Sequence, residues 1–447
     1  MNLTSLLAIA AGAAPWSPAA APLAPCPAVG PPKVVFPSDT PSHATGPGAI
    51  VWDAAPGCPG REGARLAAIG AGDAPGTSTM PREAVGQPIT LRGPLKVATA
   101  PHGQIAIAGA SPAGQQHGLL IQGRAGGAFS SLSSFEGSPA PLALTTAYLG
   151  DVGVAFTPAT GRGVSAGGPG VGVERYYSNV LSSRLSAGAG AAHATSRLAL
   201  ALDYRTDAMT VWAQRGVLYA HDLPASGANS PTQRLAHVGA HVRISALLSD
   251  ANRATVAWAE DNAGETSVYV DRSAAGVRFG APRLLERFRD PDGLSSPPGS
   301  PTLVRLSTES VMLAWAGAAH GRWAVRTAAV NATGVGNAST IATPGVDALL
   351  AAFAPGPDGE ALALWTEPQQ TGGGAPDMSR QAILSARGLD VSAGRTRFGA
   401  PEQVAPPGPN NDATVALDPS DDAAVAAWRG EGGRVRYAIR GALSAAP

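Results

Sequence analysis

Two short motifs in this sequence have the residue types of a reactive or a metal-binding loop. Residues 163–167, GVSAG, match the G-x-S-x-G pattern that presents a nucleophilic serine, here Ser165, between a strand and a helix. The residues that follow, GPGVGVER, have no helical pattern, so we interpret this segment as a loop. Residues 289–293, RDPDG, begin like a calcium loop, but Pro301 stands where that loop needs a bidentate glutamate. A solvated loop is the preferred interpretation, with a calcium site completed by distant loops as the alternative.

Paired histidines and carboxylates are also present, in positions that do not suit catalysis. His237 and His241 have a helical spacing inside a segment expected to form a turn and a strand, so they should not share a face. Adjacent carboxylates at hairpin ends cannot converge across a pocket, as acid–base catalysis requires. These adjacent pairs are Glu260 with Asp261 and Asp421 with Asp422. The sequence therefore predicts no catalytic residue, no metal site and no cofactor.

The composition is typical of a turn-rich chain with many strands. Of 447 residues, 56 are Gly and 40 are Pro, and only 14% are charged, which leaves little material for long helices. The 32 basic and 32 acidic residues balance, so no basic surface for nucleic acid or anionic lipid is predicted. Lys33 and Lys96 are the only lysines, and the other basic residues are Arg, as codon bias in a GC-rich genome would produce.

The N-terminal region has the features of an export signal. Residues 1–25 contain an apolar run of about a dozen residues followed by small residues, which is too short to span a bilayer. A positively charged start is missing, so an Ala/Pro-rich disordered leader is the alternative. Cys26 and Cys58, the only cysteines, flank a Pro/Gly-rich segment and predict a disulfide. We therefore expect a secreted or cell-envelope protein without a membrane span.

A short apolar run that ends in an aromatic residue recurs along the chain. Residues 414–428, TVALDPSDDAAVAAW, show the unit: an apolar run, an acidic turn, and a second apolar run closed by tryptophan. Weaker upstream copies carry Phe156 or Gly109 in place of the tryptophan. The copies recur at intervals of about 45 to 65 residues, which suits propeller blades better than a rigid solenoid. The tryptophans of the full copies are Trp212, Trp258, Trp315, Trp365 and Trp428.

The residues after each tryptophan complete a four-stranded unit. A third run alternates with period two, and a fourth is clearest in RFGAPRLLE and RFGAPEQVA, at Phe279 and Phe398. Seven such units over residues 96–447 predict an all-β fold, a seven-bladed β-propeller of four-stranded antiparallel blades.

The last unit ends without its fourth strand, so the N-terminal segment is expected to close the ring. Residues 26–95, pinned by the disulfide, would supply this strand from 33–36 or from 64–70. An eighth unit built around Trp52 is the alternative.

In their four-stranded units, five of which have a tryptophan after an Asp- or Gly-rich turn, residues 96–447 resemble secreted bacterial β-propellers, including the sialidase-like group. The resemblance lies in the repeat: the sialidase Asp-box, S-x-D-x-G-x-T-W, is absent, as are the WD40 and kelch signatures. Propeller sialidases use an arginine cluster, a Tyr/Glu nucleophile pair and an Asp acid, so the resemblance implies that an enzyme of this kind would need the same residue types. Glu174, Tyr176 and Tyr177 in VERYY are the only neighbouring residues of the Tyr/Glu types, and an alternating surface strand is the preferred interpretation.

These patterns favour an exported, monomeric, non-enzymatic propeller that binds a carbohydrate, a peptide or a cell-envelope component through its loop face. A propeller-type glycoside hydrolase or lyase is the alternative, and it would need several arginines and two carboxylates around the axis. Long insertions after Phe156, before Trp315 and after Trp365 are expected on one face of the ring. The candidate binding residues in or beside them are Arg162, Arg287, Arg289, Asp290, Asp292, Trp323 and Gln369.

Overall fold

The computed structural model describes most of the chain between residues 15 and 441. Left out are 18–21, 24, 37–47, 57, 59–62, 70–74, 77, 101–103, 113–116, 148–150, 159–170, 178–179, 188–196, 228–229, 250–252, 274–277, 292–299, 307–309, 332–333, 342–344, 357–358, 371–375, 392–394 and 419–422. Within the described residues, none lies in a helix with the length and apolar character needed to cross a membrane.

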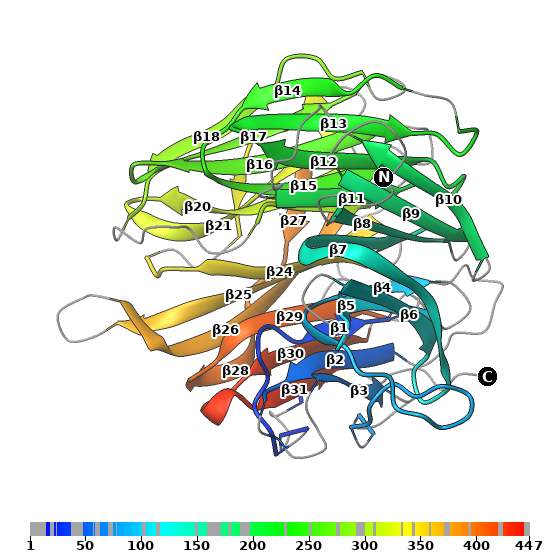
Figure 1. Cartoon of the computed structure of the whole chain (residues 1–447). Coiled ribbons are helices and arrows are strands. Elements are labelled where there is room, and N and C mark those ends of the chain that lie inside the picture. The colour runs from blue at the N-terminus through cyan, green and yellow to red at the C-terminus, as the bar shows by residue number, and fades with distance from the viewer. Residues whose placement is uncertain are drawn as a thin grey trace, which may run out of the picture.

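The described strands form eight antiparallel blades arranged in a ring (Figure 1). One long strand, β7 (Phe129–Thr146), serves two blades, because its first half pairs with the strand before it and its second half with the strand after it. The predicted class, an all-β propeller, is confirmed. The predicted count of seven is wrong, since residues before 96 build a blade of their own around Trp52.

Each blade places its strands in chain order from the axis outward. The innermost strands are β1 (Lys33–Val35), β4 (Arg92–Ala100), the second half of β7, β11 (Arg197–Leu202), β15 (His241–Leu248), β19 (Thr302–Arg305), β24 (Leu349–Pro355) and β29 (Asn411–Leu417). The second strands are β2 (Gly48–Ala54), β5 (Gln104–Ala110), β8 (Val152–Pro158), β12 (Ala208–Gln214), β16 (Ala254–Asn262), β20 (Val311–Ala319), β25 (Glu360–Gln370) and β30 (Ala424–Arg429).

The third and outer strands complete the blades. The third strands are β3 (Gly63–Ile69), β6 (His117–Arg124), β9 (Val171–Tyr177), β13 (Val217–Leu223), β17 (Glu265–Arg272), β21 (Arg322–Asn331), β26 (Pro376–Val391) and β31 (Val435–Arg440). The outer strands are the first half of β7, β10 (Val180–Ala187), β14 (Gln233–His237), β18 (Arg283–Arg289), the pair β22 (Gly334–Val335) and β23 (Ser339–Thr340), and the pair β27 (Arg395–Phe398) and β28 (Glu402–Gly408).

The apolar core lies between the blades. Buried apolar side chains of the described residues form eight clusters, and each cluster joins two adjacent blades. The aromatic residue of the repeated unit lies on the second strand and packs against the preceding blade: Trp212 lies in the cluster that also holds Val173 of β9, and Trp258 in the one that holds Val211 of β12. Both tryptophans are at most 1% exposed, and burying each contributes about 2 to 3 kcal/mol.

The N-terminal residues close the ring, as predicted, but through a different segment. The predicted strands 33–36 and 64–70 lie in β1 and β3 of the first blade. The outer edge of the last blade is instead lined by residues upstream of them: the amide of Ser17 donates to the Ile439 carbonyl at 2.7 Å, and that of Leu23 to the Val435 carbonyl at 3.0 Å. The expected disulfide between Cys26 and Cys58 is present and lies beside this edge. In Figure 1 the first and last strands of the chain, β1 to β3 and β30 to β31, accordingly lie side by side.

Antiparallel order assigns the loops to two faces. The hairpin between second and third strands lies on the same face as the connection between blades, and we call this the connection face. Three of these hairpins are two-residue turns in which both central residues have positive φ, with Gly second: Arg215–Gly216, Ala263–Gly264 and His320–Gly321. Such type I′ turns match the twist of the strands that they join. These three hairpins therefore project little from the connection face. The segment after Trp365 is different, because β25 and β26 extend it into a long hairpin.

Candidate functional site

The inner strands enclose an axial channel. Each inner strand contacts the inner strands of both neighbouring blades, so the eight strands form a closed ring around the axis. Among the described residues, two cavities lie inside this ring, and together their linings include residues of the inner strands of all eight blades. Both are lined mostly by the first residues of the inner strands, which places them at the connection face.

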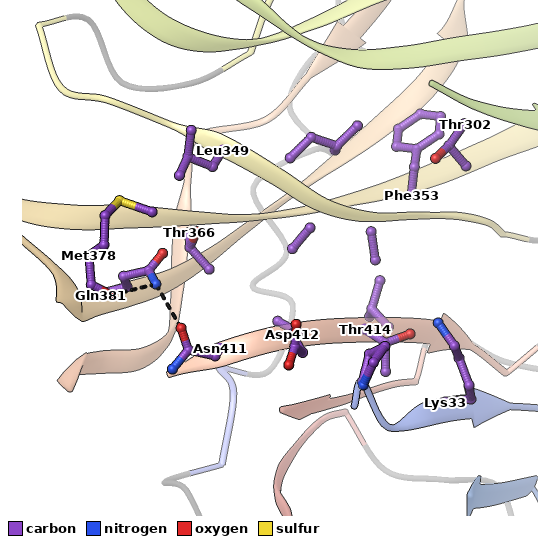
Figure 2. Close-up of a pocket in the computed structure, with 16 residues that line it drawn as sticks. Lys33, Thr302, Leu349, Phe353, Thr366, Met378, Gln381, Asn411, Asp412 and Thr414 are labelled. Carbon is purple, nitrogen blue, oxygen red and sulfur yellow. Dashed lines mark hydrogen bonds between the residues drawn. The ribbon is translucent and has the colours of Figure 1, made fainter. Parts of the chain in front are cut away.

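The larger cavity has a volume of about 500 Å³ and lies between the first blade and the sixth to eighth blades. Figure 2 shows its lining: Lys33 on β1 faces Phe353 and Thr302 across the cavity, and Asp412 lies on the strand beneath. Polar and apolar groups alternate around it. The labelled lining residues are Lys33, Thr302, Leu349, Phe353, Thr366, Met378, Gln381, Asn411, Asp412 and Thr414.

Polar side chains at the edge of this cavity are held in place by the protein. The Gln381 side-chain amide donates to Asn411 Oδ1 at 3.1 Å and to the Met378 carbonyl at 3.0 Å (Figure 2). Asp412 accepts hydrogen bonds from the Arg429 guanidinium, which forms an ion pair with it. Because these side chains are already ordered, they lose less conformational entropy when a ligand binds.

The smaller cavity, of about 260 Å³, lies on the side of the second to fifth blades. It is lined by Lys96 and Pro94 of β4, and by Arg197 of β11 across from them. Lys96 and Arg197 are both exposed to the channel. Three of the lining residues of the two cavities, Lys33, Lys96 and Arg197, are therefore cationic, and one, Asp412, is acidic.

The surroundings of Lys33 and Lys96 lower the pKa of both side chains. Burial within the ring lowers the pKa of Lys33, and the positive charge of Lys96 lowers it further, while Asp412 partly offsets these effects. Water reaches Lys96, yet protein surrounds it on several sides, and this loss of bulk solvent lowers its pKa as well. The charge of Lys96 is thus one of the two effects that lower the Lys33 pKa.

Irregular pairing of the inner strands shapes both cavities. The register of β29 shifts between Asn411 and Thr414, and Asp412 there has a positive φ of 54°. The register of β4 shifts just before Lys96, and those of β7 and β24 shift at Leu142 and next to Ala351. Bulges re-aim side chains and bend a strand, and here they occur where the strands line the cavities.

Three of the residues predicted at the long insertions lie at the outer strand of the fifth blade, on the outside of the ring. Arg287 and Arg289 are exposed on the outer strand β18, where Arg287 Nε lies 3.4 Å from Glu265 Oε1. Asp290 accepts a hydrogen bond from Thr266 Oγ1 at 3.0 Å. The structure brings these three together, away from the axial cavities.

The other predicted residues do not join this group. Trp323 is only 1% exposed and packs edge-on against Phe288, so its side chain belongs to the core. Gln369 is half-buried on β25 in the long hairpin. Arg162 and Asp292 lie outside the described residues, as does Ser165.

Several of the remaining candidates for catalysis have structural roles, whereas Tyr177 is exposed and Asp421 and Asp422 lie outside the described residues. Tyr176 Oη donates to Glu174 Oε2 at 2.5 Å, but both side chains are at most 2% exposed between the second and third blades. His237 and His241 lie on strands of different blades. Asp261 is held by a bidentate contact with Arg243, both bonds at 3.0 Å. Among the described residues, no three His, Cys, Asp or Glu side chains are grouped as metal ligands would be.

Sequence reasoning missed the residues that line the channel. Its one usable signal was the rarity of lysine: both lysines of the chain occur in a short strand-like run that opens a unit. An inner strand faces the axis, so a long cation on it points toward the channel or the neighbouring blade.

Comparisons with known proteins give no family for this chain. No protein-family model matches it, and no curated protein matches it. Solved structures match in fold only, with low identity. A polysaccharide lyase, the PL25 ulvan lyase, has a TM-score of 0.47 and 10% identity, covering 96% of this chain and 97% of that one. Puromycin hydrolase has a TM-score of 0.43 and 15% identity, covering 78% of this chain and 53% of that one. A subtype N10 neuraminidase-like protein of A/little yellow-shouldered bat/Guatemala/060/2010 has a TM-score of 0.27 and 8% identity, covering 55% and 94%.

Proposed function

We propose that this protein is an exported, non-enzymatic β-propeller that binds a carbohydrate, a peptide or a cell-envelope component at the mouth of its axial channel. The observation that carries this proposal is the pair of cavities on the connection face, lined by side chains of inner strands and shaped by four irregular strands. Cavities of several hundred Å³ with a few oriented polar groups among apolar ones are typical of ligand sites.

Export is supported by the disulfide, because such bonds persist in oxidising compartments. A removable leader would have to end before Trp16, since the Trp16 indole donates to Ser385 Oγ at 2.9 Å and its backbone pairs with Arg440. The mass of the protein recovered from the native host tests this limit. A monomer is proposed as well, and light scattering tests it.

A cavity-filling variant tests the location of binding. Ala351 is an exposed residue of the larger cavity, and Ala351→Trp would fill the space that a ligand needs. Val85, which is 78% exposed, gives a matched control, Val85→Trp. On a glycan and peptide array, we expect the first variant to lose the ligand and the second to keep it. Equal binding by Ala351→Trp and the unmodified protein would place the ligand elsewhere.

A lyase is the second candidate, and Lys33 is the observation that favours it. A lysine with a lowered pKa beside a cavity can act as a general base. A hydrolase is less well supported, because the lining of the two cavities supplies one carboxylate, Asp412, rather than a pair. Incubation with acidic polysaccharides distinguishes a lyase from a binding protein, since elimination leaves an ultraviolet-absorbing unsaturated product.

A further inference from the structure

The two lysines of the chain lie 63 residues apart in sequence, yet each lines a cavity at the axis. Lys33 opens β1 of the first blade, and Lys96 lies on β4 of the second, and these two inner strands are in contact. Elsewhere in the described structure, ion pairs use arginine, such as Arg243 with Asp261 and Arg440 with Glu402. The only side-chain ammonium groups of the chain thus lie on two adjacent inner strands at the axis.

This arrangement destabilises the folded protein when no ligand is bound. Two positive charges that repel each other are partly removed from bulk water, and both effects oppose folding in the charged state. The nearest acidic group that acts on Lys33 is Asp412, and Arg429 already forms an ion pair with Asp412. Arg197 adds a third cation across the smaller cavity. The mouth of the channel therefore has a positive potential, which a cleft with protein walls focuses.

We propose that the channel mouth binds an acidic saccharide, with a carboxylate or sulfate group of the sugar placed between Lys33 and Lys96. This inference rests on the proposed function and names its ligand class. An ammonium group is a compact charge with three donors, which suits a single anionic group that approaches from a wide channel. A bound anion would also remove the repulsion between the two lysines.

The rest of the lining favours a sugar over an acidic peptide. Thr302, Thr366 and Thr414 supply hydroxyl groups, and Gln381 and Asn411 supply amides. Hydroxyls and amides both donate and accept hydrogen bonds, as sugar hydroxyl groups also do. Met378, an exposed apolar side chain of the lining, can pack against the C–H face of a sugar ring.

Amine acetylation tests the location directly, because Lys33 and Lys96 carry the only side-chain amines of the chain. The full-length protein is treated with acetic anhydride, with and without an oligogalacturonide or a chondroitin sulfate oligosaccharide, and the modified sites are counted by mass spectrometry. We expect the acidic saccharide to slow acetylation of both lysines, and a neutral saccharide of equal length to leave it unchanged. Unchanged acetylation of both lysines when the saccharide is bound would overturn the proposal.

Binding by charge variants tests the mechanism. Lys33→Gln and Lys96→Gln should each weaken binding of the acidic saccharide about tenfold, as loss of a hydrogen bond to a charged group does. Lys33→Arg should keep most of the affinity, and Arg289→Gln, which removes an exposed cation at the rim, should have no effect. Thermal unfolding of each variant shows that it is folded.

The outcomes separate this inference from the proposed function. If neutral and carboxylate-bearing oligosaccharides bind equally and Ala351→Trp blocks both, the binding site stands but its charge preference is refuted. If Arg289→Gln weakens binding and the lysine variants do not, the site lies at the rim. If polyglutamate binds with the same lysine dependence and no saccharide does, the ligand is an acidic peptide. If no member of the panel binds, both proposals fail.

Discussion

Replacing Asp151 by Asn should stabilise the protein at neutral pH. Asp151 directly precedes β8 and is only 2% exposed. Neither of its carboxylate oxygens accepts a hydrogen bond from the described residues. Burial raises its pKa to about 6, and the positive charge of Arg175 offsets only part of this effect. The folded state therefore prefers the neutral acid, which Asn resembles in size and shape.

The magnitude follows from the pKa. Raising a carboxyl pKa from 3.8 to about 6 disfavours the charged form by about 3 kcal/mol. Polarisation and relaxation of the protein around a buried charge reduce this energy, so we expect about 2 kcal/mol. The folded pKa lies above the unfolded one, so the destabilisation is absent below pH 3.8. It grows as the pH rises between 3.8 and about 6 and is complete above that range.

The assay is unfolding by urea at pH 8 and at the lowest pH at which the protein stays folded, in constant salt. Asp151→Asn should raise the free energy of unfolding by about 2 kcal/mol at pH 8 and change it little at low pH. Asp377→Asn is the control, because hydrogen bonds from Ser379 lower the pKa of that exposed carboxyl, and its removal should not stabilise. A variant of Asp151 that is no more stable than the unmodified protein at pH 8 would refute the reasoning.

Three further predictions concern the same fold. Asp222→Asn should also stabilise above pH 6, since burial and then the charge of Asp207 raise the Asp222 pKa to about 6; urea unfolding at pH 8 checks this. Trp428→Ala should cost about 3 to 5 kcal/mol, because Trp428 is fully buried between the last two blades, and an unchanged unfolding midpoint would contradict this. Replacing Cys26 and Cys58 by Ser should cost about 3 kcal/mol, and hydrogen exchange should then show the N-terminal edge of the last blade opening more readily.

The repeat predicted the blades well where a large side chain marks each one. Trp212, Trp258 and Trp315 are fully buried at equivalent positions of second strands, because the space between wedge-shaped blades needs a large side chain. The first blade was harder to predict. Its inner strand has only three residues, and its outer edge is a single pairing of Leu66 with Thr79, so only Trp52 matches the repeat.

The closing segment could not be predicted by pattern. Trp16 and Pro27 join the last blade through isolated bridges, and Ala28 joins it through a single hydrogen bond, rather than through an alternating strand. Such contacts depend on tertiary structure, and they leave no period in the sequence. The disulfide could be predicted, because two cysteines allow only one pairing.

The count of blades bears on why the site lies at the axis. An eighth blade moves the inner strands farther from the axis than seven would, as adding strands widens a barrel, so side chains on inner strands cannot fill the centre. Water then occupies the channel, and a charged side chain can project into it without full burial, as Lys96 does. A pattern that predicts seven blades predicts a narrower axial channel that side chains fill. Binding residues are then expected in the loops at the rim of the ring. The count was wrong because residues 33–36 were expected to complete the last blade, whereas they form the inner strand of a separate blade, which carries Lys33.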